Sequence, residues 1–262
     1  MNRFITAGMG LALVATPLVA TTATASDTTE RSTAPAYSVS ASINKTTAIA
    51  GEDIVAIRGK VTPRAAGQKV VLQQRMENKQ TWKKSGTATI KPTGKFVIKD
   101  DPSTAGTRFY RVLKPAGQGM SKGVSKEVQL VVFKWENLGQ RVRNTTTNIL
   151  AKTAVIATDA YPTSLVNGIP GSPALVEYTL GKKCLALKAT YALDDSTATG
   201  GTGSVALKAD GAAVFTSNLT LGQVIENEIN ITNAFRISYE LTSTATPASY
   251  VAVGSPKVLC TV

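Results

Sequence analysis

The sequence predicts an all-β protein built from two β-sandwiches. The chain is rich in Thr, Ser, Ala, Val and Gly and lacks long apolar runs at helical spacing. Short apolar segments alternate with Gly, Pro, Asn and Asp, as strands alternate with turns. Between residues 180 and 215, two candidate strands flank an acidic, Gly-rich loop, and Asp210-Gly211 then predicts a tight hairpin, because this pair readily adopts positive φ angles.

The first 25 residues are typical of a secretory signal peptide. Arg3 precedes an apolar run over residues 4–20, and Ala23-Thr24-Ala25 offers the small residues at which signal peptidase cuts. The unbroken apolar part is shorter than the ~20 residues of a spanning helix, so we expect no transmembrane anchor. Residues 26–36 are rich in Thr and Ser and predict a flexible leader. The mature chain is thus expected to be secreted and extracellular, and it could associate with the cell wall.

The mature length of about 237 residues suits two domains. We expect the first over residues 37–133 and the second over 134–262. Seven short strands in the first domain predict an immunoglobulin-like sandwich. The expected strands cover residues 37–43, 53–61, 68–76, 81–90, 94–100, 108–115 and 124–133.

The segments AGEDIVAIRGKVTP, GQKVVLQQR and TRFYRV in this domain resemble the bacterial Ig-like modules common in exported actinobacterial proteins. The resemblance implies a spacer or an adhesive repeat.

Basic charge is concentrated in the first domain. Residues 26–133 hold 18 Lys and Arg against 8 Asp and Glu, whereas residues 134–262 hold 10 against 9. Such a domain could attract an anionic cell-wall polymer, or its charges could form a solvated face. Export and the lack of a nucleic-acid-binding motif argue against nucleic acid. The candidate basic patch comprises Lys83, Lys84, Arg108, Arg111 and Lys114.

The second domain resembles the NPCBM family, carbohydrate-binding modules first noticed beside glycoside hydrolase family 98 catalytic domains. The resemblance covers Trp135 to Val262. It is carried by a strand ending in LDDS, a Gly-rich loop, the run SVALKADGAAVFTS and then LTLGQ. It implies a galactose-binding-like jelly roll that binds a glycan. The chain departs from the family pattern in having no His before the LDDS strand and no Trp in its final strand.

The ligand-binding candidates are Trp135, Tyr161, Asp194, Asp195 and Tyr250. Trp135 could stack on a sugar ring or fill the core. The adjacent carboxylates Asp194 and Asp195 have three interpretations: hydrogen bonding within their own loop, direct ligand contact, or a calcium site. Calcium is the only cofactor that the sequence leaves open.

Cys184 and Cys260 are the two cysteines of the chain. In an exported protein they predict one disulfide that ties the last strand to the strand beginning near residue 184. Closing a loop of this length should stabilise the fold by about 4 kcal/mol.

Nothing in the motifs favours an enzyme. The chain has no His, which excludes His-based triads and H-E-x-x-H zinc sites. The sequence therefore predicts a secreted, non-catalytic carbohydrate-binding or cell-surface adhesion protein, with recognition at the loop ends of the second sandwich. Two alternatives stay open: a structural or protein-binding surface factor with a degenerate sugar site, and an accessory that assists a carbohydrate-active enzyme in trans.

Overall fold

The computed structural model describes residues 34–261, and these residues form an all-β protein, as the sequence predicts. The expected signal peptide and residues 26–33 of the expected leader lie outside the described residues. The last three leader residues contact the first sandwich, where the Ser121 N–H donates to the Pro35 carbonyl at 2.8 Å. No helix in the described part is long and apolar enough to cross a membrane.

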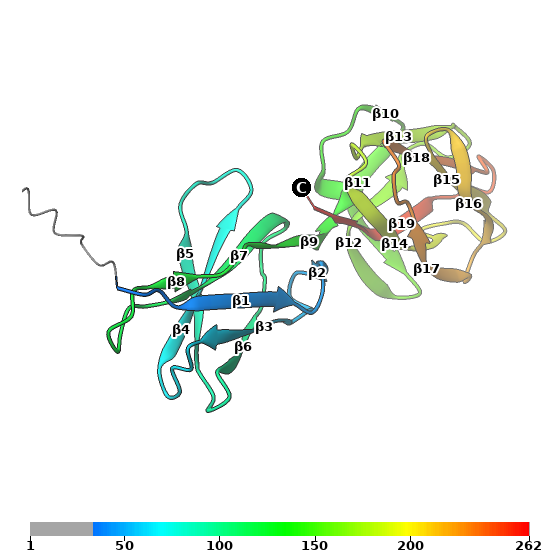
Figure 1. Cartoon of the computed structure of the whole chain (residues 1–262). Helices are drawn as coiled ribbons and strands as arrows, with labels where there is room; N and C mark the ends of the chain where they lie inside the picture. Colours follow the sequence, from blue (N-terminus) through cyan, green and yellow to red (C-terminus); the bar gives the residue numbers. More distant parts are fainter. Residues whose placement is uncertain (1–33, 262) are drawn as a thin grey trace, which may run out of the picture. The chain divides into compact units, whose positions relative to one another are not determined.

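The first sandwich packs two sheets against each other (Figure 1). One sheet has the order β1-β3-β6, and the other has the order β9-β7-β4-β5, with β2 parallel to β9 and β8 against β7. Alternate residues of both sheets meet in one core, for example Ile57 and Phe96 from the first and Leu72 and Tyr110 from the second. The strands are β1 (Ser38–Ile43), β2 (Thr47–Ile49), β3 (Val55–Thr62), β4 (Lys69–Met76), β5 (Lys83–Thr89), β6 (Lys95–Asp100), β7 (Gly106–Lys114), β8 (Gly123–Val124) and β9 (Val128–Asn137).

All seven strands expected in this region are present, each within a few residues of its expected bounds. The additional strands β2 and β8 have three and two residues, too short to show a period in the sequence. Strand β9 runs on past residue 133: its first part pairs with β7 and β2, and Lys134–Asn137 pair with β19. No Gly or Pro interrupts this strand.

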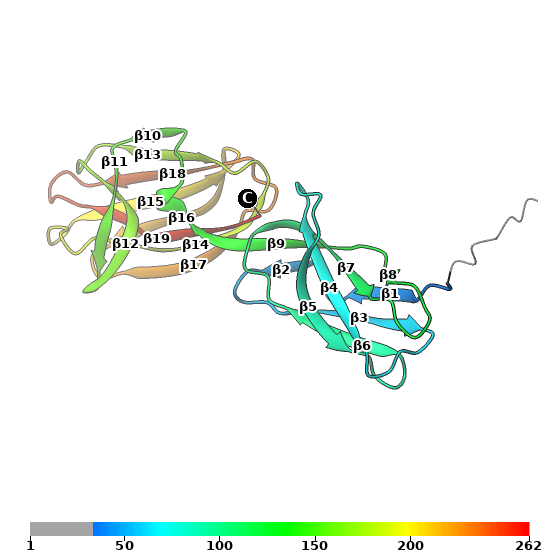
Figure 2. The ribbon, with the colours of Figure 1, turned by 90° about the vertical axis from the view of Figure 1, so that its left-hand side faces the viewer.

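The second sandwich also has two layers (Figure 2). One sheet has the order β10-β13-β18-β15-β16, and the other has the order β11-β12-β19-β14-β17. Their facing residues form a large buried core that includes Tyr178 and Tyr239 from the first sheet and Leu187, Tyr191 and Val253 from the second. The strands are β10 (Thr145–Thr147), β11 (Ile149–Ile156), β12 (Asp159–Asn167), β13 (Ala174–Thr179), β14 (Cys184–Leu193), β15 (Thr202–Ala209), β16 (Ala212–Thr220), β17 (Val224–Asn230), β18 (Arg236–Ser243) and β19 (Val251–Cys260).

The hairpin predicted at Asp210-Gly211 is confirmed. Both residues have positive φ, 48° and 86°, and they join β15 to β16. The Asp210 carboxylate also accepts hydrogen bonds from the N–H groups of Phe235 and Arg236 at the start of β18. These bonds hold the pKa of Asp210 below its ordinary value of 3.8.

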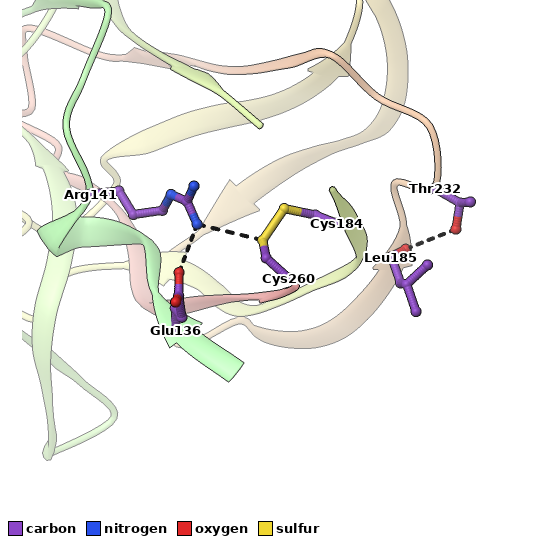
Figure 3. The surroundings of a disulfide bond; sticks show 6 residues. All are labelled: Glu136, Arg141, Cys184, Leu185, Thr232 and Cys260. Atoms are coloured by element: carbon purple, nitrogen blue, oxygen red, sulfur yellow. Dashed lines mark hydrogen bonds and ion pairs between the residues drawn. A yellow bond between two sulfur atoms is a disulfide. The ribbon is translucent and has the colours of Figure 1, made fainter. Parts of the chain in front are cut away.

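The predicted Cys184–Cys260 disulfide is also confirmed (Figure 3). The two cysteines are directly opposite each other on β14 and β19, and both are buried. Arg141 approaches the bond, with its Nη1 atom 3.6 Å from the sulfur of Cys260 and 2.8 Å from the Glu136 carboxylate (Figure 3). The disulfide therefore joins the last strand, β19, to the neighbouring strand β14 at the end of β19 that pairs with β9.

Candidate functional site

A groove of about 430 Å³ lies on the outer face of the second sandwich, over β12, β14, β17 and β19. These strands pair side by side, with β14 between β17 and β19 (Figure 1). The residues that line the groove are Tyr161, Lys188, Ala189, Thr190, Glu226, Asn227, Glu228, Gly254, Ser255 and Lys257. We call this the outer-face groove.

Strand alternation explains why charged side chains line a sheet face. On β14, Leu187 and Tyr191 point into the core, so Lys188 and Thr190 face outward. The register places Lys188 opposite Glu228 of β17 on one side and opposite Lys257 of β19 on the other. The floor of the groove is therefore a row of ammonium and carboxylate groups.

Tyr161 forms one wall of the groove. It lies on β12, next to the turn of the β11–β12 hairpin, and is half-buried. Beneath it, Gly254 leaves the space that the ring needs: a Cβ atom at Gly254 would lie 2.9 Å from Tyr161 Cδ1 and 3.1 Å from Ile156 Cδ1. Those distances are too short for ordinary carbon contacts. Any side chain at position 254 would displace the ring.

Apolar and polar contacts hold the β11–β12 hairpin against the neighbouring strands β14 and β19 of its sheet. A small buried cluster joins Ala154, Ile156 and Val166 of the hairpin to Ala192 and Ala252 of the sheet, and Tyr161 and Tyr250 pack against this cluster. At the other end, Ser255 of β19 donates from its Oγ to the Pro162 carbonyl at 2.8 Å and from its N–H to Ser164 Oγ at 3.1 Å. The position of Tyr161 is thus set by both strands of the hairpin.

Asp194 and Asp195 hold the same hairpin from its side. The Asp194 carboxylate is buried and accepts hydrogen bonds from the N–H groups of Val155 and Ser196. The exposed Asp195 carboxylate accepts from the N–H groups of Ala157 and Thr158. All four carboxylate oxygens therefore have backbone donors, of which only Ser196 lies in the loop of the pair itself and the other three belong to the β11–β12 hairpin. Among the described residues, no three His, Cys, Asp or Glu side chains form a group that could hold a metal ion.

The two remaining candidates lie at different places. Trp135 of β9 is half-buried, and Lys188 Nζ lies 4.0 Å from the centroid of its ring. Its ring is thus joined to the groove through a cation–π contact with a lining residue. Tyr250 precedes β19, beside the Asp194 loop, where its N–H donates to Thr197 Oγ1. Trp135 and Tyr161 therefore belong to the surroundings of the groove, whereas Tyr250 supports the hairpin.

The candidate basic patch requires correction. Lys83 and Lys84 are exposed, and Arg111 is half-buried with its guanidinium 4.2 Å from the Trp82 ring centroid. Arg108 and Lys114, however, are only 4% and 1% exposed. They lie on β7 at positions whose side chains point inward, and a sequence position alone does not show which face of a strand is solvated.

Lys114 illustrates how a buried lysine is accommodated. Its Nζ donates to the Pro115 carbonyl at 2.6 Å and lies 4.1 Å from the centroid of the Tyr37 ring. Burial lowers the pKa of Lys114, because desolvation disfavours the charged form. This lysine acts within the first sandwich and offers no charge to a polymer outside it.

Sequence reasoning missed Lys188, Glu226, Glu228 and Lys257. The signal for Glu226 and Glu228 is present in the segment VIENEINIT, where both alternate with isoleucines that pack against the core. That alternation predicts a polar face on one strand. It does not show that the polar faces of three strands meet in one groove.

Comparison with known proteins adds little to this description. No protein-family model matches the chain, and no curated protein matches it significantly. Among solved structures, it is similar to the CBM36-1 domain of a multidomain xylanase from the hindgut metagenome of Trinervitermes trinervoides. The match has 13% sequence identity and a TM-score of 0.30, and it covers 48% of this chain and 95% of that domain. Function is therefore inferred from the geometry of the groove.

Proposed function

We propose that this chain is an exported, non-catalytic protein that binds a carbohydrate in the outer-face groove of its second sandwich. The observation that carries the proposal is the combination of an aromatic wall, Tyr161, with a floor of ammonium and carboxylate groups in an open groove of about 430 Å³. The resemblance of residues 135–262 to NPCBM modules agrees with it.

The chemistry of the groove suits a sugar. Each sugar hydroxyl both donates and accepts hydrogen bonds, and the groove offers donors from Lys188 and Lys257 beside acceptors from Glu226 and Glu228. The flat apolar face of Tyr161 can pack against the C–H groups of a pyranose ring. A few polar groups arranged around an aromatic side chain are the usual composition of a small-ligand site.

The groove runs along a sheet face and not at the loop ends where the sequence analysis expects recognition. An open groove on a sheet face leaves room for a ligand that extends beyond the groove. We therefore propose that the ligand is an internal segment of a glycan chain, such as a polysaccharide of a cell surface.

Several features support a non-catalytic role. Glu226 and Glu228 are both exposed, whereas a general acid at neutral pH needs a buried carboxyl group with a raised pKa. The segment Gly119–Gly123 has the spacing G-x-S-x-G, but the Oγ of Ser121 donates to the Ala34 carbonyl and the chain has no His to activate it. We therefore propose binding without turnover.

Retention of the mature chain on purified cell walls and insoluble polysaccharides tests this function. The assay is run in about 1 M NaCl, where the screening length is about 3 Å and long-range attraction is suppressed. We expect salt-resistant retention that weakens about tenfold in Tyr161→Ala, because the stacking surface is lost. The matched control is Phe235→Ala, which removes an exposed aromatic ring outside the groove and should leave retention unchanged.

The other outcomes are equally informative. Retention that disappears in high salt would mean that the basic first sandwich attracts an anionic wall polymer electrostatically, without a specific glycan site. No retention would reject the glycan proposal and favour a protein partner. Release of soluble sugar would contradict the non-catalytic role. Addition of EDTA should leave retention unchanged, because the carboxylate oxygens of Asp194 and Asp195 already accept backbone hydrogen bonds.

A further inference from the structure

A second pocket, of about 500 Å³, lies in the first sandwich. Its walls come from the end of β4, the β4–β5 connection, the β6–β7 connection and the start of β7. Basic residues dominate its charge: Arg75, Lys79, Lys83 and Arg108 line it, against Asp100 and Asp101. None of these residues belongs to the outer-face groove. We call it the first-sandwich pocket.

Arg108 is the unusual residue of this pocket. It is only 4% exposed, and within the described residues no carboxylate lies within 4.0 Å of its guanidinium. A guanidinium stays charged at all ordinary pH values, and a buried charge is costly unless it is paired. Arg108 is therefore a buried cation without an ion-pair partner in the described part of the chain.

The hydrogen bonds of Arg108 are also incomplete. Its Nη1 donates to Gln74 Oε1 at 3.0 Å, and its Nη2 donates to the Thr104 carbonyl. Its Nε is buried and has no hydrogen-bond partner. Arginine has five N–H donors, so the neutral partners in the protein leave donor capacity unused. A buried charge whose donors are incompletely satisfied is unfavourable for the empty pocket, and an anionic ligand would relieve it.

Of the two carboxylates that line the pocket, Asp100 is already engaged. Asp100 accepts hydrogen bonds from the Tyr110 hydroxyl at 2.5 Å and from the Ser85 hydroxyl. Arg75 is paired with Glu127 at 2.9 Å, and its guanidinium lies 4.4 Å from the Phe109 ring centroid. Among the described residues, Arg108, Lys79 and Lys83 are therefore the basic residues of the pocket that have no ion-pair partner.

We propose that the first-sandwich pocket binds an oxyanion, the phosphate or carboxylate group of a ligand. Arg108 supplies the buried charge and the guanidinium donors that its two neutral partners leave unused. Lys79 and Lys83, both exposed, attract the anion at the rim. The two N–H donors of the guanidinium fork match the spacing of two oxygens in a phosphate or a carboxylate group. The single ammonium group of a lysine could not make this paired contact. This site is independent of the glycan groove, and its ligand can be tested without any sugar.

Titration of the full mature chain with inorganic phosphate tests the proposal. Amide NMR shifts are followed at constant ionic strength, and sodium acetate replaces phosphate in a parallel arm to distinguish the two oxyanions. We expect saturable shifts at residues 74–83 and 100–108 with at least one of the two, and none at Tyr161 or Lys188. Shifts that do not saturate, or that spread over exposed lysines throughout the chain, would overturn the proposal.

Charge variants separate a built site from general attraction. Lys79→Gln/Lys83→Gln should weaken binding about three- to tenfold, since each exposed charge contributes up to about 1 kcal/mol. Lys69→Gln/Lys95→Gln makes the same change in charge at exposed positions outside the pocket and should have no effect. Arg108→Lys keeps the charge and removes the fork, so it should weaken binding more than tenfold. If both double lysine variants weakened anion binding equally, or if neither weakened it, the pocket would be rejected as the site.

Discussion

Asp195 fixes the position of Thr158: its Oδ2 atom accepts a 2.8 Å hydrogen bond from the Thr158 N–H. Its Oδ1 atom accepts a second bond, of 2.9 Å, from the N–H of Ala157. Ala157 and Thr158 have φ values of 49° and 74°, respectively, in the left-handed region that costs L-residues about 1–2 kcal/mol each. The carboxylate offsets this strain, and the turn that it holds leads directly to Tyr161 in the proposed glycan groove.

Replacing Asp195 should therefore loosen the hairpin. We expect Asp195→Ala to lower the free energy of unfolding by about 1–2 kcal/mol, because two charge-assisted hydrogen bonds are lost. Hydrogen exchange should accelerate at the amides of Ala157 and Thr158. Asp159→Ala removes another exposed carboxylate beside the same turn and serves as the control. An equal loss of stability in the control would show that general charge, and not these hydrogen bonds, is responsible.

Gly254 should be required for the aromatic wall of the groove. Gly254→Ala places a Cβ atom 2.9 Å from the Tyr161 ring, so the ring must move. We expect retention on the glycan to fall about two- to tenfold, the value of one stacking contact. Gly86→Ala in the first sandwich creates a similar crowding, 3.1 Å from an Ile98 methyl group, and should leave retention intact. Unchanged retention in Gly254→Ala would exclude Tyr161 from the binding surface.

The disulfide should contribute strongly to stability. Its cysteines are 76 positions apart, so the double variant Cys184→Ser/Cys260→Ser should lose about 4 kcal/mol of unfolding free energy, chiefly by freeing the unfolded chain. Urea unfolding of the variant and of the oxidised and reduced wild type measures the effect. The reduced wild type should behave like the variant. A variant as stable as the oxidised protein would show that the bond does not constrain the unfolded state.

Asp210 should make stability depend on pH on the acid side. Backbone hydrogen bonds from Arg236 and Phe235 hold its pKa below 3.8 in the folded state. Because the pKa of Asp210 is lower in the folded state, the ionised carboxylate stabilises the fold at pH values above the unfolded-state pKa, about 3.9. This contribution is lost as the pH falls through the folded-state pKa. Asp210→Asn preserves the turn, since Asn tolerates positive φ.

We therefore expect Asp210→Asn to be less stable than the wild type at pH 7. The difference should shrink toward about pH 2, below the unfolded pKa of an aspartate. Unfolding by urea at both values measures it. A difference that stays constant with pH would show that the carboxylate charge at Asp210 is not involved.

Much of the fold follows from local sequence. Alternating apolar residues predict the strands of the first sandwich, and Asp210-Gly211 predicts a hairpin because few other pairs accept its backbone angles. The short strands β2 and β8 cannot be predicted in this way, because two or three residues are too few to show an alternation of apolar and polar side chains. The hairpin at Ala157 and Thr158 also escapes it, because neither residue favours positive φ and a distant carboxylate stabilises the turn.

The sequence by itself determined the all-β class, the pairing of Cys184 with Cys260 and the choice of Tyr161 as a candidate ligand-binding residue. Only the tertiary structure decided that Lys188, Glu228 and Lys257 share one row, and that Arg108 is buried while Lys83 is exposed. The reason is physical: the alternation of side chains along a strand is a local property. Which strands become neighbours, in which register and with which face covered, depends on contacts between residues far apart in the chain.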